Sequence, residues 1–233
     1  WVDKEGIEQA VSALISDVVI RHKFEECVDI PANHTYSVPF ELTPKHQKIY
    51  DELEEESIAI LQNTQVSAVH GGALYTKLLQ IASGAVYNDD GDYSTVASER
   101  YELVLDLVEQ RRHSVVFYLW EHQLQELLVE AKKRKLSHAV WDPDKPGIAD
   151  EYQKGLYQVL FAHPASAGHG LTLTKGTATI WASPTPNLEW FSQGKKRLHR
   201  IGQNKATETI VVIAENTRDV KVFDSLMRKD VKM

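Results

Sequence analysis

Residues 177–214 read TATIWASPTPNLEWFSQGKKRLHRIGQNKATETIVVIA. The two ends of this stretch, residues 177–182 and 209–214, are short runs rich in β-branched and aromatic side chains, as expected of strands buried on both faces. Between them, residues 188–198 are predicted to form a helix. A strand, a helix and a strand in this order indicate two parallel strands joined by a crossover helix.

The same alternation of strands and helices extends over residues 98–233. Two further apolar runs, residues 114–119 and 157–162, have the composition of buried strands. Helices are predicted over residues 121–135 and 219–227, where apolar side chains recur at helical spacing. The pattern therefore predicts an α/β fold, with a parallel sheet flanked by helices.

Residues 1–97 follow a different pattern, which is mostly helical. Helices are predicted over residues 5–19, from Pro44 onward, and over residues 74–83. Before Pro44, residues 34–42 alternate apolar and polar side chains, as a half-buried strand would. We therefore divide the chain near residue 97 into a mostly helical N-terminal extension and a sheet-forming part.

The composition is that of a globular protein. Of the 233 residues, 42% are hydrophobic, which suffices for one core. No apolar run approaches the roughly 20 residues that a membrane helix needs, and the opening residues lack the features of a signal peptide. We expect an intracellular protein that makes no membrane contact. Because the chain begins with Trp1 rather than methionine, we also expect it to be a piece of a longer protein.

Metal and redox chemistry have little support in the sequence. The single cysteine, Cys27, can form neither an internal disulfide nor a thiolate zinc site. The ten histidines make no HxH or HxxxH pair, so we predict no metal site. The net charge of -7 argues against a surface that is basic throughout, so any contact with nucleic acid must be local.

Basic residues gather in three places, at residues 111–113, 132–135 and 195–200. The middle cluster ends the helix predicted over residues 121–135. Positive side chains there complement the negative end of the helix dipole, so we interpret this cluster as structural.

In doubly wound sheets, ligands bind at the carboxyl ends of the strands, so the loops that follow the strands are the candidate sites. After residues 157–162 the chain contains SAGHGLTL, residues 166–173. Glycines at 168 and 170 would let backbone amides approach an anion or a phosphodiester, and nearby hydroxyl groups add donors. Taken alone, the loop is explained as readily by a tight structural turn.

A second candidate site has a more specific pattern. Residues 193–203 read QGKKRLHRIGQ, with Arg197 and Arg200 three positions apart near the end of the helix predicted over residues 188–198. This spacing places the two guanidinium groups on the same side, where they could converge on one anion. A guanidinium stays charged and forks onto phosphate oxygens. A solvated basic helix end is the alternative, but it would require neither the glutamine nor the closing IGQ.

This second stretch resembles the sixth motif of Swi/Snf-type superfamily-two helicases and DNA translocases, QxxxRxHRIGQ. Residues 167–173, AGHGLTL, resemble the fifth motif of that family, and residues 115–118, VVFY, are similar to the fourth. Residues 19–23, 30–31 and 42–44 resemble the family's connector from its first lobe. The resemblance covers nearly the whole chain, and it implies the C-terminal, second RecA-like lobe of such a protein, with residues 98–233 as the lobe proper and residues 1–97 as the connector.

The resemblance also implies that ATP binds between two lobes. This chain has no GxxxxGK[ST] loop for phosphates and no DExx acidic pair after a strand for Mg²⁺. ATP and Mg²⁺ are therefore expected to be held mainly by an N-terminal RecA-like lobe absent from this chain. Arg197 and Arg200 would act as catalytic arginine fingers at the γ-phosphate, and this chain alone is expected to be inactive.

The remaining motif residues take supporting roles by the same resemblance. Gln193, Gly168 and Gly170 would lie at the ATP site, with Gln193 helping to position the arginines. Ser166 and Thr172 would contact the DNA backbone without reading its sequence. We expect the DNA to be double-stranded and the motion to be translocation along intact duplex, with strand separation as the open alternative.

An alternative of a different class is a non-catalytic module for binding nucleic acid or protein, which keeps the fold of a helicase lobe without the motor. A lysine-bearing phosphate loop upstream in the parent reading frame would favour the motor.

We expect three tryptophans to pack in the core or between lobes, with base stacking as the alternative: Trp120, Trp181 and Trp190.

Overall fold

The computed structural model describes residues 6–19, 29–63, 68–88, 90–167 and 171–230. Within these residues, six strands form one sheet in the order β1-β8-β7-β4-β6-β5, and every neighbouring pair is parallel. The strands are β1 (Asn33–Phe40), β4 (Ser114–Phe117), β5 (His138–Val140), β6 (Val159–Ala162), β7 (Ala178–Trp181) and β8 (Thr207–Ala214).

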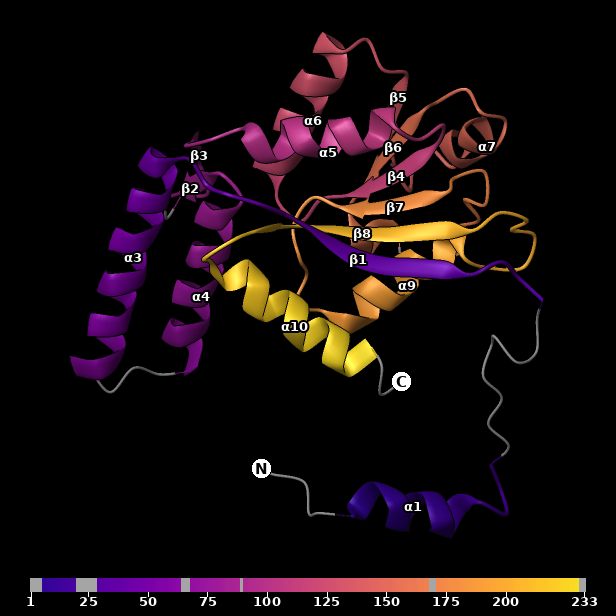
Figure 1. Cartoon of the computed structure of the whole chain (residues 1–233), viewed down its shortest axis with the longest axis horizontal. Helices are drawn as coiled ribbons and strands as arrows, with labels where there is room; N and C mark the ends of the chain where they lie inside the picture. Colours follow the sequence, from indigo (N-terminus) through magenta and orange to yellow (C-terminus); the bar gives the residue numbers. More distant parts are fainter. Residues whose placement is uncertain (1–5, 20–28, 64–67, 89, 168–170, 231–233) are drawn as a thin grey trace.

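Helices cover both faces of this sheet (Figure 1). One face packs on α5 (Glu99–Glu109) and α6 (Glu121–Lys133), and the other on α9 (Leu188–Leu198) and α10 (Arg218–Asp230). Shorter helices, α7 (Gly147–Gln153) and α8 (Pro164–Ala167), lie in the connections.

The alternation of side chains along each strand explains the two layers. In β4, Val116 packs with α5 and α6, whereas its neighbours Val115 and Phe117 pack with α9 and α10. Ile180 and Trp181 of β7 divide between the two faces in the same way. The predicted α/β fold, a RecA-like parallel sheet between helices, is confirmed.

The N-terminal part contributes both to the sheet and to a helical protrusion. β1 pairs along its whole length with β8, so the sheet extends across the division near residue 97, which stays a prediction. Two helices, α3 (Pro44–Asn63) and α4 (Ala68–Ala82), form the protrusion, which stands at the carboxyl ends of the strands (Figure 1). The hairpin of β2 (Ala85–Tyr87) and β3 (Tyr93–Thr95) follows. The first helix, α1 (Ile7–Ile15), lies apart from the sheet and exposes Val11 and Leu14.

A buried arginine fastens the protrusion to the sheet. The guanidinium of Arg100, at the start of α5, donates to the carbonyls of Ala82, Ala182 and Val212 at 2.9 to 3.0 Å. It also pairs with the carboxylate of Asp219 at 2.6 Å, and both side chains are at most 2% exposed. One side chain therefore joins the end of α4 to the carboxyl ends of β7 and β8 and to α10.

The middle basic cluster lies at the carboxyl end of α6, as predicted. Lys132 and Lys133 lie in the last turn of α6. Arg134 caps that helix and pairs with Glu130 of α6 and with Asp106 of α5. This cluster therefore ties two helices together.

Across the described ranges, none of the helices is both long and apolar enough to cross a membrane.

Candidate functional site

The two candidate arginines lie at the far end of α9. This helix begins after the carboxyl end of β7 and runs back along the sheet, so its last turn lies near the amino ends of β7 and β8. Gln203 marks this position, because its amide donates to the carbonyl of Gly176, two residues before β7, at 3.1 Å. The expectation that the site would lie at the carboxyl ends is therefore wrong for Arg197 and Arg200, because a full helix separates them from the strand they follow.

The guanidinium groups of Arg197 and Arg200 converge. Each donates from Nη1 to the same acceptor, the carbonyl oxygen of Leu171, at 3.4 Å for Arg197 and 2.8 Å for Arg200. Burial lowers the pKa of Arg197, and the neighbouring charge of Arg200 lowers it further. Arg197 nevertheless stays protonated, because an arginine does not lose its charge under ordinary conditions.

A small cavity opens beside these two arginines. Its volume is about 240 Å³, and it is lined by Lys196, Arg197, His199 and Arg200. Among the described residues, the ion pairs include no carboxylate that neutralises Arg200. The cavity is therefore a cationic pocket whose lining suits an anion with several oxygens.

The closing IGQ fixes the end of α9. The buried amide of Gln203 donates to the carbonyls of Thr174, Gly176 and Leu198 at 3.1 to 3.3 Å, and its oxygen accepts from the next two backbone amides. Gly202 has a φ of +95°, a conformation that favours glycine. These two residues hold the turn after the arginines, which explains why the motif ends on them.

Gly194 lets α9 approach the sheet. A Cβ atom at this position would lie 2.8 Å from Trp181 and 2.9 Å from Phe117. Those two buried rings stack on each other with centroids 4.7 Å apart, so neither can move aside easily. The glycine therefore sets the depth at which the helix that carries the arginines is seated.

The remaining predicted site residues lie in α9 and in residues 166–173. Gln193 lies one turn before Arg197, and its amide donates to Glu189 at 2.9 Å. Thr172 is exposed beside Leu171, close to the arginines. Ser166 instead lies in α8, just beyond the carboxyl end of β6, and its hydroxyl donates to the carbonyl of His163 at 3.0 Å. Gly168 and Gly170 lie outside the described residues.

Aromatic side chains gather at the carboxyl edge, near Ser166. His163 packs edge-on against Tyr118 and against Trp190, with centroids 5.7 and 5.6 Å apart. Trp181 is fully buried, and Trp120 stacks on His122. All three tryptophans therefore pack against neighbours within the lobe. In the described ranges, no group of three or more His, Cys, Asp or Glu side chains is placed to hold a metal ion.

The sequence did not reveal the hydrogen-bond acceptor that the two arginines share. Leu171 acts through its backbone carbonyl, so its residue type gives no signal, and only the fold brings it to Arg197 and Arg200. The sequence also did not indicate which group His199 contacts. In the structure its ring bonds to the carbonyl of Pro31, 168 positions away.

Comparisons with known proteins agree with this architecture. The chain is 29% identical to the putative protein p41 of Acyrthosiphon pisum secondary endosymbiont phage 1, over 90% of the chain and 46% of that protein. It is 24% identical to an uncharacterized ATP-dependent helicase of Mycoplasma genitalium, over 94% of the chain and 22% of that protein. It is also 24% identical to the mouse DNA annealing helicase and endonuclease ZRANB3, over 93% of the chain and 20% of that protein. The chain thus spans less than half the length of these relatives, and no protein-family model matches it.

Solved structures share the fold along most of the chain. The C-terminal part of the Fun30 ATPase domain superimposes with a TM-score of 0.65 at 15% identity, and the match covers 84% of the chain and 89% of that structure. The Sulfolobus solfataricus SWI2/SNF2 ATPase core in complex with double-stranded DNA gives a TM-score of 0.66 at 16% identity, over 95% of the chain and 50% of that structure. In fold, this chain is similar to the C-terminal lobe of Swi2/Snf2 ATPases.

Proposed function

We propose that this chain is the second motor lobe of an ATP-dependent DNA translocase. The convergence of Arg197 and Arg200 on one carbonyl, beside a cationic cavity, is the observation that carries the proposal. A first lobe, outside this chain, would hold the nucleotide and Mg²⁺. Closure of the two lobes would bring the γ-phosphate of ATP to the arginine pair.

The two arginines would then exchange one neutral acceptor for a charged one. The carbonyl of Leu171 offers each guanidinium a single hydrogen bond, whereas a phosphate offers several oxygens and a negative charge. The exchange stabilises the charge that spreads over the transferred phosphoryl group. An arginine supplied in this way increases the rate by roughly 10³ to 10⁵. Gln193, one turn earlier on α9, would help to keep the arginine side chains aimed at that anion.

The fifth motif would carry the contact with DNA. Ser166 lies at the carboxyl edge of the sheet, and Thr172 lies next to the carbonyl that receives the arginines. We assign both hydroxyl groups to backbone contacts with double-stranded DNA, and we place Gly168 and Gly170 near the nucleotide. One short segment would thus touch the DNA at one end and the arginines at the other. This gives a physical route from ATP turnover to movement along DNA.

Replacement of Arg200 tests the proposal in the complete two-lobe protein. R200A should keep nucleotide binding measurable and lower DNA-stimulated ATP hydrolysis by on the order of 10³ or more, because the transition-state charge loses a donor. R200K should not restore turnover, since lysine is a point charge without the planar fork. The measurement is the ATP turnover rate with and without duplex DNA, beside the dissociation constant of the nucleotide.

Lys196 is the matched control, because it lines the same cavity but its side chain is exposed. K196A should change turnover by less than a factor of about three, as expected when a solvated charge is removed. Full DNA-stimulated turnover in R200A would refute the arginine-finger assignment. Equal losses in R200A and K196A would mean that the cavity acts through its overall charge and not through a positioned finger.

A further inference from the structure

His199 lies between the two arginines in sequence and ends α9 as its C-cap residue. The residue is only 8% exposed, and Nε2 lies 3.0 Å from the carbonyl oxygen of Pro31. A carbonyl oxygen can only accept a hydrogen bond, so the Nε2 atom carries the proton and donates it to Pro31. His199 thereby ties the arginine segment to the residues that enter β1.

The receiving stretch, residues 30–32, is held from its other side by β8. The backbone amide of Thr207 donates to the carbonyl of Ala32 at 3.0 Å, and Asn33 donates to the Thr207 hydroxyl at 2.8 Å. Residues 30–32 therefore lie between the sheet edge and the end of α9. They connect the chain that precedes the sheet to the arginine segment.

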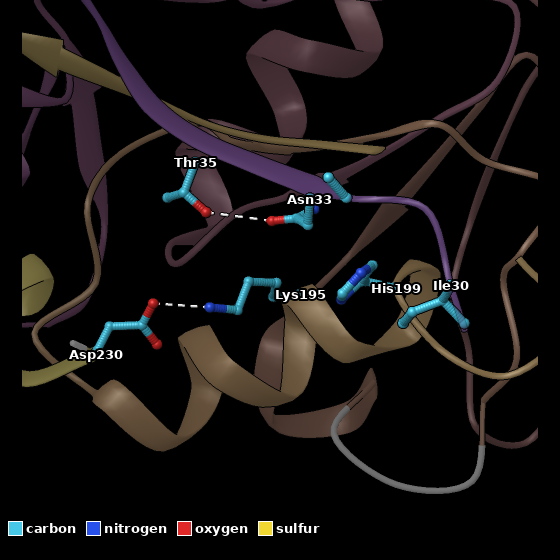
Figure 2. A pocket seen from close by; sticks show the side chains of 7 residues that line it. Ile30, Asn33, Thr35, Lys195, His199 and Asp230 are labelled. Atoms are coloured by element: carbon cyan, nitrogen blue, oxygen red, sulfur yellow. Dashed lines mark hydrogen bonds and ion pairs between the residues drawn. The ribbon is translucent and has the colours of Figure 1, made fainter. Parts of the chain in front are cut away.

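A cavity of about 560 Å³ separates β1 from α9 beside this contact. Figure 2 shows Asn33 and Thr35 of β1 on the side opposite Lys195, with His199 and Ile30 beside each other at one end. Lys195 pairs with Asp230 of α10 at 2.7 Å, which anchors α9 to its neighbouring helix. The helix is thus fixed on the side of α10, while the hydrogen bond from His199 crosses to the chain on the side of β1.

We infer that His199 is a positioning residue. Through its hydrogen bond, the position of residues 30–32 determines where Arg197 and Arg200 lie. This inference rests on the proposed function. Residues 30–32 continue into the segment that leads to the first lobe on that proposal, so a lobe movement would shift them first. The open cavity leaves room for such a shift, and the hydrogen bond from His199 would pass it to the arginines that flank it.

The experiment uses the complete two-lobe protein and three substitutions. H199A removes the donor, whereas H199Q keeps an amide N–H at about the reach of Nε2. H46A is the control, because His46 makes a similar buried contact, from Nε2 to the carbonyl of Ile81 at 2.6 Å, in the protrusion far from the arginines in sequence. The readouts are kcat and KM for ATP with duplex DNA, and the melting temperature.

H199A should lower kcat by on the order of tenfold or more while KM for ATP stays within about twofold, because a misplaced catalytic group slows the reaction more than it weakens ground-state binding. H199Q should recover most of kcat. H46A should lower the melting temperature and leave kcat unchanged. If H199A does not fold, H199N replaces it, because its shorter amide cannot reach Pro31.

Two failures can be told apart. If R200A abolishes DNA-stimulated turnover but H199A keeps full kcat, or if H46A loses as much kcat as H199A, the positioning role is wrong and the motor assignment stands. If the intact protein shows no DNA-stimulated hydrolysis, or if R200A retains it, the proposed function fails and the inference fails with it. A loss of kcat that H199Q does not restore also overturns the inference, because the donated hydrogen bond would then not be its cause.

Discussion

At the scale of single residues, His122 of α6 is buried between two hydroxyl groups. Its Nε2 atom lies 2.9 Å from the hydroxyl of Ser83, and its Nδ1 atom lies 2.9 Å from that of Tyr87. The Ser83 hydroxyl donates to the carbonyl of Gln80 at 2.8 Å, so it accepts from Nε2, and Nδ1 then accepts from Tyr87. This arrangement holds the ring neutral, and burial lowers its pKa to about 4.

The lowered pKa of His122 predicts a loss of stability in mild acid. Its ordinary pKa is 6.5, so between pH 6.5 and pH 4 the unfolded chain binds a proton that the folded chain does not. The contribution of His122 to the free energy of unfolding should therefore be complete above pH 6.5, fall by roughly 3 kcal/mol as the pH drops through this window, and level off below it. Urea unfolding at pH 7 and pH 4.5 measures the fall.

H122Q is the comparison, because glutamine keeps polar atoms at this position but does not titrate. Its free energy of unfolding should fall less than that of the native chain between the same two pH values. Equal falls in both proteins would show that other titrating groups, and not His122, cause the acid sensitivity.

Residue types alone predicted the two arginines of the site, but they could not predict the backbone groups that the site residues contact. Arg197 and Arg200 could be singled out because guanidinium chemistry and their spacing point to an anion. Their common acceptor could not, because every residue has a carbonyl, and only folding brings that of Leu171 to them. The same holds for the contact of His199 with Pro31, which joins segments 168 positions apart.

At the scale of elements, the close packing of α9 against the sheet depends on Gly194. G194A should destabilise the fold by about 1 to 3 kcal/mol, because the new methyl group would press on two rings of the core. The matched control is G72A in α4, where a Cβ atom meets nothing within 4 Å and alanine favours the helix by about 0.5 to 1 kcal/mol. The two substitutions should therefore change the free energy of unfolding in opposite directions. Urea unfolding of both variants measures this, and a G194A variant as stable as the native chain would rule out the tight approach.

Elements with a strong local pattern were predictable, and those with a weak one were not. The helix predicted over residues 188–198 has those bounds. Three of the four buried strands lie within their predicted ranges, and β8 begins two residues before its predicted range. β5 has three residues, and α7 has seven, too few for either periodicity to be read. β1 was predicted as a strand, but its place in the sheet was not, because pairing with β8 is a long-range contact.

At the scale of the whole molecule, Arg100 and Asp219 join three parts of the structure. Arg100 belongs to α5, its partner Asp219 belongs to α10, and the carbonyl of Ala82 brings in the protrusion. The Asp219 carboxylate also accepts the backbone amide of Ala214 at the end of β8. The guanidinium lies over the ring of Phe40 in β1, 4.8 Å from its centroid. The carboxyl ends of three neighbouring strands and the protrusion thus meet at one buried charge pair.

The costs of removing the two partners of this pair should not add. R100M leaves the Asp219 carboxylate buried without its counter-charge, and it should lower the free energy of unfolding by about 3 to 5 kcal/mol. The double variant R100M/D219L should lose less than the sum of the two single variants, because neither charge is then left alone. K48A, which breaks the exposed pair of Lys48 with Glu52, should cost less than about 1 kcal/mol.

Hydrogen exchange locates the effect of the buried pair within the molecule. In R100M, the backbone amides of α4 should exchange faster by a larger factor than those of β4, because α4 loses the hydrogen bond that fastens it to the sheet, whereas β4 keeps its neighbours on both sides. Uniform acceleration across both elements would mean that R100M weakens global stability alone. A selective effect on α4 would establish that this side chain helps to hold the protrusion against the sheet.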